Sequence, residues 1–301
     1  ADIEKGGVFA SIWGVYNLLP EKLRKNVIGV IVNKFRGDLT LFDEGIRIIE
    51  EDFKIPVLGV LPYLPFNLGF EDSASLKNFV QQPRNKKLDI AVIAYPYMSN
   101  YNDFEPLIAD DEVFVEFVSS NISLEKFDLV ILPGSKLVIK DLIWLKQMGL
   151  FEQIKNYKKD ICAICGGYEM MFESLNDIYA LENEQALKEE GFGFIPDIIT
   201  FEKEKILEKK SYDLFGTKID GFEIHHGMCQ KYPLSFEKEN FKGTFVHQIF
   251  DNNEFRTKYF KSIKSDYVGF NFQEYKKQTV DNFISTLKAK LDVEHLIKSI
   301  S

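Results

Sequence analysis

Cysteine is scarce in this chain of 301 residues, which has three: Cys162, Cys165 and Cys229. A small, odd number without zinc-type spacing argues against a disulfide framework and a structural metal site. The sequence also lacks an uninterrupted apolar run of the ~18 to 20 residues that a membrane-spanning helix needs. We therefore expect no membrane insertion, and a cysteine that is free to react.

The chain lacks an export signal and an excess of positive charge. Residues Ala1 to Gly7 show no signal-peptide pattern, which predicts a cytoplasmic protein. A net charge of -9 disfavours nucleic-acid binding, because neutralising phosphates needs clustered Lys and Arg. The hydrophobic share of 45% and the charged share of 28% are typical of globular proteins.

The first part of the chain has the pattern of an α/β domain. Apolar runs at 27–32 and 57–61 flank a helical spacing of apolar residues from Phe42 to Phe53, which predicts parallel strands joined by a helix. Ala1 to Ile3 look like the end of a strand whose beginning is missing, so we expect a fragment of a longer protein.

Polar and proline signals at 81–87 predict a linker between two domains. We place the first domain at residues 1–82 and the second at 87–301.

The second part begins a new α/β series. Strand candidates are 90–94, 113–118, 129–132 and 161–164, followed by shorter, antiparallel candidates at 221–224, 244–246 and 267–272. The Glu- and Lys-rich segment 182–210 is predicted to form exposed connections, and the apolar spacing from Val280 to Leu291 predicts a packing helix.

Cys165 has the sequence context of a nucleophile. An apolar strand runs into Cys165-Gly166-Gly167 and then into a helix-compatible segment, which is the strand-turn-helix geometry of a nucleophile elbow. A helix N-terminus favours negative charge and so a thiolate. Cys162 lies inside the strand, and Cys229 has no such context, so both are interpreted as structural.

A thiolate that attacks an amide needs an acid–base partner, because the departing nitrogen must be protonated. His225 and His226 follow one predicted strand, and His247 ends another. The three are close competitors on chemistry alone, whereas His295 lies on the predicted C-terminal helix. A second glycine turn follows the strand at 129–132, and backbone N–H groups near Gly134 and Gly166 are candidates for binding an oxyanion.

The ordered motifs resemble the cobyric acid synthase family of cobalamin biosynthesis, whose members carry a class I glutamine amidotransferase domain. The resemblance rests on Pro-Gly-Ser-Lys, Ile-Cys-Gly-Gly-Tyr, Gly-Phe-Glu-Ile-His and Gly-Thr-Phe-Val-His at 133–136, 164–168, 221–225 and 243–247. Further matches follow the same order at 1–10, 32–38, 57–65, 71–73 and 99–104. The related cobyrinic acid a,c-diamide synthases share the Cys and the His but fit the first ten residues less well.

The resemblance implies a fold and an activity. It implies a partial, P-loop-type parallel sheet domain similar to dethiobiotin synthetase, followed by a flavodoxin-like α/β amidotransferase domain. The implied reaction is the glutamine-dependent, ATP-driven amidation of adenosylcobyrinic acid a,c-diamide to adenosylcobyric acid. The implied partners are glutamine, the corrinoid and ATP with Mg²⁺, no cofactor is implied in the glutaminase domain, and a homo-oligomer is left open.

The resemblance also assigns roles to residues. It implies that His247 is the catalytic acid and base, and that His225 and Glu169 line the glutamine site. In the first domain it places Asp2 near Mg²⁺ and phosphate and Asn33 on the adenine edge. Pro62 and Tyr63 would line the nucleotide pocket.

Three departures from the family pattern stand out. No Gly-x-x-x-x-Gly-Lys-Ser/Thr phosphate loop occurs in the sequence. Glu169 stands where the family usually has glutamine, and Ile249 stands where many class I enzymes have a Glu, so the group that orients the histidine is not identified. The alternatives are a non-catalytic corrinoid- or nucleotide-binding module, a cobyrinic acid a,c-diamide synthase, and a cysteine hydrolase of esters or peptides.

Overall fold

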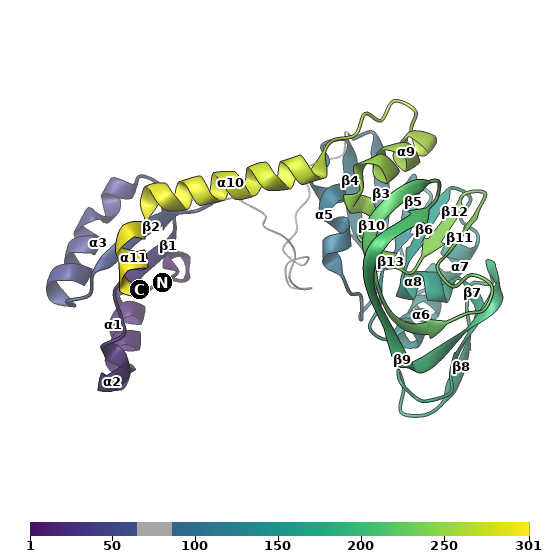
Figure 1. The fold of residues 1–301 in the computed structure, drawn as a ribbon, viewed down its shortest axis with the longest axis horizontal. Helices are drawn as coiled ribbons and strands as arrows, with labels where there is room; N and C mark the ends of the chain where they lie inside the picture. The colour runs from purple at the N-terminus through teal and green to yellow at the C-terminus, as the bar shows by residue number, and fades with distance from the viewer. Residues whose placement is uncertain (65–85, 301) are drawn as a thin grey trace. The chain divides into compact units, whose positions relative to one another are not determined.

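The computed structural model describes residues 1–64 and 86–300, which fall into two compact units (Figure 1). The first unit comprises Ala1–Leu68 with Glu274–Ser301, and the second comprises Gly69–Gln273. Most of the predicted linker at 81–87 lies outside the described residues, as do the motif residues 71–73. The domain boundary near residue 82 therefore stays a prediction.

Two parallel strands, β1 (Val30–Phe35) and β2 (Val57–Pro62), form the centre of the first unit. Phe35 lies opposite Pro62 at their carboxyl ends. The predicted strand-helix-strand order is confirmed, with β1 shifted toward the C-terminus. The helical elements are η1 (Ile3–Lys5), α1 (Val8–Leu18), α2 (Glu21–Arg24), η2 (Leu39–Phe42), α3 (Asp43–Arg47) and η3 (Ile48–Asp52).

The C-terminal helices α10 (Phe272–Lys290) and α11 (Val293–Ile300) follow the second unit in sequence. The turn between them pairs with β2, because Leu291 forms an antiparallel bridge with Gly59 and the Asp292 N–H donates to the Leu58 carbonyl at 2.9 Å. The structure thus groups Glu274–Ser301 with the first unit, whereas the sequence placed these residues in the second domain. An open strand edge offers unpaired backbone groups, and apolar spacing cannot indicate which edge a helix end will occupy.

A six-stranded sheet forms the main layer of the second unit, in the order β11-β12-β6-β5-β3-β4. All pairings are parallel except that of β11. The strands are β3 (Leu88–Ile93), β4 (Val113–Val118), β5 (Leu129–Leu132), β6 (Asp160–Ile164), β11 (Ser235–Lys238) and β12 (Phe241–Thr244). The four predicted strands at 90–164 are confirmed, and the complete burial of β5 fits a parallel sheet covered on both faces.

Among residues 86–271, the helical elements that accompany this sheet number six. They are η4 (Tyr101–Phe104), α5 (Glu105–Ile108), α6 (Val138–Gln147), α7 (Leu150–Lys155), α8 (Gly166–Met170) and α9 (Asn253–Ile263). The α/β fold class predicted for both parts of the chain is confirmed. No helix within residues 1–64 and 86–300 is both long and apolar enough to cross a bilayer.

A second sheet in the same unit has the order β13-β10-β9-β7-β8. Its strands are β7 (Phe172–Asp177), β8 (Leu187–Glu190), β9 (Ile195–Leu214), β10 (Thr217–Met228) and β13 (Val246–His247), with η5 (Ile249–Asp251) after it. The hairpin of β9 and β10 is long and curved (Figure 1).

The prediction of exposed connections at 182–210 is wrong, because β8 and most of β9 lie there. Glu and Lys have low strand propensity, so a segment rich in these residues did not predict strands. Their hydrogen bonds to the neighbouring strands come from the backbone and do not depend on the side chains.

The predicted strand at 267–272 is also wrong. These residues form a loop that ends at the start of α10. Gly269 has a positive φ of 86°, and the Tyr267 hydroxyl is buried in a hydrogen bond to Asp110. The Arg256 guanidinium donates to the Phe270 carbonyl at 2.6 Å. The alternating apolar residues therefore anchor a loop on the core and do not form a ladder.

Candidate functional site

Cys165 lies at the sharp turn between β6 and α8, as the sequence predicted. Its φ of 50° and ψ of -112° fall outside the regions that most residues adopt, which costs on the order of 1–3 kcal/mol and occurs mainly at functional sites. Two hydrogen bonds hold the turn: the Cys165 N–H donates to the Thr244 carbonyl at 2.8 Å, and the Gly167 N–H donates to the Pro133 carbonyl at 2.9 Å. A Cβ on Gly167 would lie 2.2 Å from the Leu132 carbonyl oxygen, so only glycine permits this approach.

His247 is the histidine that the structure brings to the cysteine. The Cys165 sulfur lies close enough to His247 to raise the pKa of its ring. Its Nδ1 lies 2.6 Å from Asp103 Oδ2, and the Gln248 N–H donates to the other oxygen, Asp103 Oδ1, at 2.8 Å. Both side chains of the His–Asp pair are buried, with exposures of 0% and 1%. Cys165, His247 and Asp103 thus form a continuous chain of contacts.

The electrostatics of this chain of contacts favour a protonated imidazole. Burial alone would lower the pKa of His247, but the Asp103 carboxylate and the Cys165 sulfur outweigh it and raise that pKa to about 10. A cation beside the sulfur stabilises a thiolate. The site therefore places a protonated imidazole beside the sulfur.

Asp103 is the orienting group that sequence reasoning did not identify. It belongs to η4, and 144 positions separate it from His247 in sequence. Its motif, 99–104, was noted only as a family match. Asn100, from the same motif, places its side-chain nitrogen 2.9 Å from His247 Nε2. The place of Asp103 in that motif was the signal present in the sequence.

The other histidines have different surroundings. Both ring nitrogens of His225 have partners, with Nδ1 2.8 Å from the Gly227 carbonyl and Nε2 3.3 Å from Glu223 Oε2, and the ring stacks on Phe245. His226 Nδ1 lies 2.9 Å from the Glu202 carbonyl. His295 is exposed on α11, in the first unit.

The two glycine turns predicted to bind an oxyanion lie against each other. A Cβ on Gly166 would be 2.7 Å from the Ser135 amide nitrogen, and a Cβ on Gly134 would be 3.0 Å from His247 Cε1. The Ser135 hydroxyl donates to Asp141 at 2.6 Å, which fixes the Gly134–Ser135 turn. The Ser135 N–H is therefore a third backbone group at this place, one that the sequence analysis did not single out.

A cavity of about 380 Å³ opens onto Cys165. The predicted residues Glu169 and His225 line it together with His226 and Ser135. Glu169 lies one helical turn after Cys165 and is only 2% exposed. Burial, with the nearby Cys165 and Glu182, raises the pKa of Glu169 well above its ordinary value, against a hydrogen bond from the Gly227 backbone. The shift favours the uncharged acid, which has one donor and one acceptor face like the amide of glutamine.

The four residues predicted to bind nucleotide lie in the first unit at the carboxyl ends of its strands. Asp2 forms a parallel bridge with Asn33 of β1, and Pro62 ends β2. The Tyr63 N–H donates to the Phe35 carbonyl at 2.7 Å, and the Arg36 guanidinium lies 3.5 Å from the Tyr63 ring centroid. Open parallel sheets bind ligands at this edge.

Asp2 pairs with Lys34 at 2.9 Å. The hydrogen bond from Lys34 is the main cause that lowers the pKa of Asp2. Within residues 1–64 and 86–300 no group of three or more His, Cys, Asp or Glu side chains is arranged to hold a metal ion. The assignment of Asp2 to Mg²⁺ stays a prediction that rests on one carboxylate.

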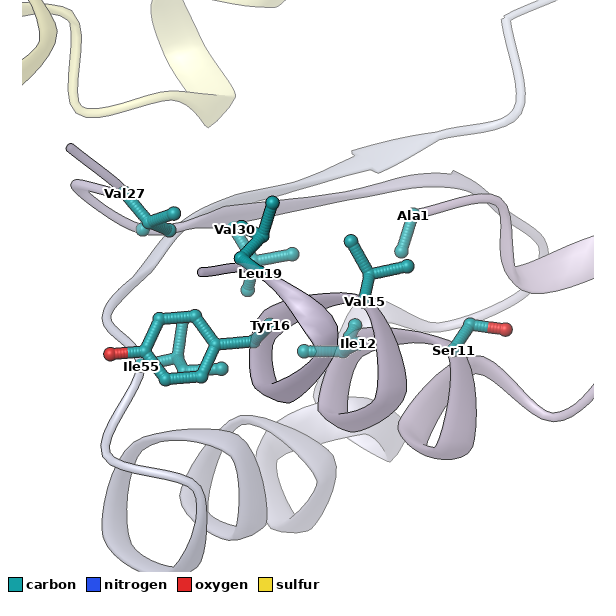
Figure 2. A pocket seen from close by; sticks show the side chains of 10 residues that line it. Ala1, Ser11, Ile12, Val15, Tyr16, Leu19, Val27, Val30 and Ile55 are labelled. Atoms are coloured by element: carbon teal, nitrogen blue, oxygen red, sulfur yellow. The ribbon is translucent and has the colours of Figure 1, made fainter. Parts of the chain in front are cut away.

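The first unit also contains an apolar cavity of about 280 Å³, which Figure 2 shows. Ile12, Val15 and Tyr16 of α1 line it, opposite Val27 and Val30. None of the four predicted nucleotide-site residues lines this cavity. It is therefore separate from the polar strand ends.

The second unit thus defines a class of protein: an α/β domain with a strand-turn-helix cysteine that faces a buried His–Asp pair. A family model described as the CobB/CobQ-like glutamine amidotransferase domain matches residues 89–255, more than half of the sequence. The chain belongs to this family. A second model, the CobQ/CobB/MinD/ParA nucleotide binding domain, matches residues 2–67.

Similar curated proteins carry the name cobyric acid synthase. The protein of Acinetobacter baylyi is 66% identical over 300 residues, which cover 100% of this chain and 64% of that protein. The protein of Clostridium tetani is 36% identical over 327 residues, covering 99% of this chain and 66% of that protein. The chain therefore spans just under two thirds of the length of these relatives.

Among solved structures, one described as a glutamine amidotransferase aligns with a TM-score of 0.42 and 11% sequence identity. The alignment covers 58% of this chain and 97% of that one.

Proposed function

We propose that the chain hydrolyses glutamine at Cys165 and that the ammonia serves an ATP-driven amidation, as part of a cobyric acid synthase. The observation that carries the proposal is the buried contact chain from Cys165 through His247 to Asp103. The family match at 89–255 and the named relatives support it.

The geometry suggests a role for each group in the first half-reaction. The Cys165 sulfur attacks the carboxamide carbon of glutamine, and the oxyanion that forms accepts hydrogen bonds from N–H groups of the Gly134–Ser135 turn and of Gly166. His247 then gives a proton to the departing nitrogen, so that the C–N bond breaks, ammonia leaves and a thioester to Cys165 remains.

The second half-reaction releases glutamate. His247 removes a proton from water, the water oxygen attacks the thioester carbon, and the C–S bond breaks to regenerate Cys165. Asp103 stabilises the imidazolium and holds the ring in place throughout, as the third group of a triad does.

The amidation belongs to the nucleotide-binding part. There, ATP would activate a side-chain carboxylate of adenosylcobyrinic acid a,c-diamide for attack by ammonia. The resemblance assigns Asp2, Asn33, Pro62 and Tyr63 to nucleotide and Mg²⁺, and their place near the carboxyl ends of the parallel pair supports this assignment. We place the reaction in the cytoplasm, with glutamine, the corrinoid and ATP as substrates.

A glutaminase assay tests the first step. The chain should convert glutamine to glutamate and ammonia, and Cys165→Ala should abolish the reaction. Cys229→Ala is the matched control and should retain it, because Cys229 lies outside the cavity lining. Unchanged hydrolysis in Cys165→Ala would refute the proposed function.

A further inference from the structure

The cavity beside Cys165 is lined by charged side chains that have no role in the proposed hydrolysis. Glu182 lines it, and so do Lys136 and Lys205. Hydrolysis of a carboxamide requires the sulfur, the imidazole and the oxyanion donors, but none of these three charged side chains. Free glutamine, however, also carries an ammonium and a carboxylate on its α-carbon, and these need partners of opposite charge.

Glu182 is fixed in this cavity from two sides. Its backbone N–H donates to Asp177 at 2.9 Å, and the neighbouring Leu181 N–H donates to the same carboxylate at 2.8 Å. Its own carboxylate accepts the Ile139 N–H at 2.8 Å, at the N-terminus of α6. A carboxylate has about four acceptor positions, so acceptor capacity remains for a ligand in the cavity.

The charges around Glu182 favour a cationic ligand. Burial raises the pKa of Glu182 to about 7 against the hydrogen bonds from the start of α6, and the carboxylates of Asp177 and Asp141 contribute to the rise. Glu169 is the other acid of the cavity, and burial, the Cys165 sulfur and the charge of Glu182 together favour its uncharged form by raising its pKa. An ammonium group placed beside Glu182 would relieve the repulsion among these acids.

We propose that Glu182 determines specificity in this site by binding the α-ammonium group of free glutamine, while Lys136 and Lys205 face its α-carboxylate. The inference rests on the proposed function and adds the recognition of the amino acid to it. The substrate class is therefore a free α-amino acid amide, and a simple amide or a glutaminyl residue within a peptide chain is excluded.

Calorimetric binding to the Cys165→Ser chain tests the proposal, because this variant holds the ligand without hydrolysing it. Glutamine should bind about tenfold or more tightly than glutaramate, which lacks only the α-amino group, since a charge-assisted hydrogen bond is lost. Adding Glu182→Gln should remove this preference. Adding Glu184→Gln, an exposed neighbour, should leave it intact.

The pH dependence gives a second readout. Glu182 is uncharged below its pKa of about 7, so the preference for glutamine over glutaramate should shrink as the pH falls from 8 to 6. Glutamine and glutaramate binding equally to the Cys165→Ser chain would overturn the proposal, as would an absence of glutamine binding. An equal loss of affinity for both ligands in Glu182→Gln would mean that Glu182 has only a structural role, and this would also overturn the proposal. The proposed function fails by a different result, undiminished hydrolysis in Cys165→Ala.

Discussion

The two units each hold a carboxylate paired with a nitrogen cation, but in very different surroundings. Asp103 and His247 are 1% and 0% exposed, whereas Asp2 and Lys34 are 23% and 45% exposed. Exposed pairs are screened by water and contribute little, while a buried charge depends strongly on its partner. Burial therefore holds His247 in a fixed orientation and charge state beside Cys165. The exposed Asp2 can exchange its partner Lys34 for another ligand.

Removing one carboxylate from each pair is the strongest way to test this comparison. Asp103→Asn should lower kcat for glutamine hydrolysis by about 10² to 10⁴-fold, because the imidazolium loses its buried counter-charge and orientation. Asp2→Asn should leave glutamine hydrolysis within about twofold, because surface changes away from a site act weakly. Steady-state kinetics measure both. Equal losses in the two variants would contradict the contrast.

The buried Glu169 allows an intermediate test within the second unit. Its pKa is raised in the folded chain, so this acid stabilises the fold at low pH. The stabilisation is lost as the pH rises above its ordinary value of 4.5. Glu169→Gln keeps the shape without the charge. Its stability advantage over the wild type should grow as the pH is raised from 5 to 9.

Hydrolysis by Glu169→Gln should stay within about threefold of the wild type, since an amide of the same shape replaces an acid whose uncharged form is favoured. Thermal melts across the pH range and pH–rate profiles measure the two effects. A stability difference that stays constant with pH would show that Glu169 is already ionised.

The substitution Gly59→Ala should have the smallest effect on activity but should clearly destabilise the first unit. A Cβ there would lie 2.3 Å from the Lys290 carbonyl oxygen, so Gly59→Ala should force the turn at Leu291 away from β2. We expect a loss of about 1–3 kcal/mol, in the range of overpacking, seen as faster hydrogen exchange at Asp292. Glutamine hydrolysis should not change; if it falls, the units are not independent in function.

Sequence patterns predicted the parts of the site whose residues are consecutive in the chain. An apolar strand followed by Cys165 and two glycines predicts the elbow, because strand, turn and helix are consecutive there. The role of Asp103 was not predicted, because 144 positions separate it from His247 in the sequence. The chemistry of the three candidate histidines was the same in sequence, and the resemblance singled out His247. The structure separates them by their partners.

The errors in the fold have related causes. The sequence did not predict β9, because its Glu and Lys side chains do not indicate that its backbone pairs with β10. The loop at 267–272 alternates like a strand, yet its apolar residues serve as anchors on a core assembled from distant segments. The pairing of Leu291 with Gly59 depends on a strand edge that composition does not reveal.

The most direct test of the Cys165 site is labelling of the chain with a diazoketone analogue of glutamine, mapped by peptide mass spectrometry. One adduct is expected, on Cys165, and its formation should slow at least about tenfold in His247→Asn, since a cation beside a cysteine activates its sulfur. Labelling of Cys229 or Cys162 in preference to Cys165, or an equal rate without His247, would contradict it.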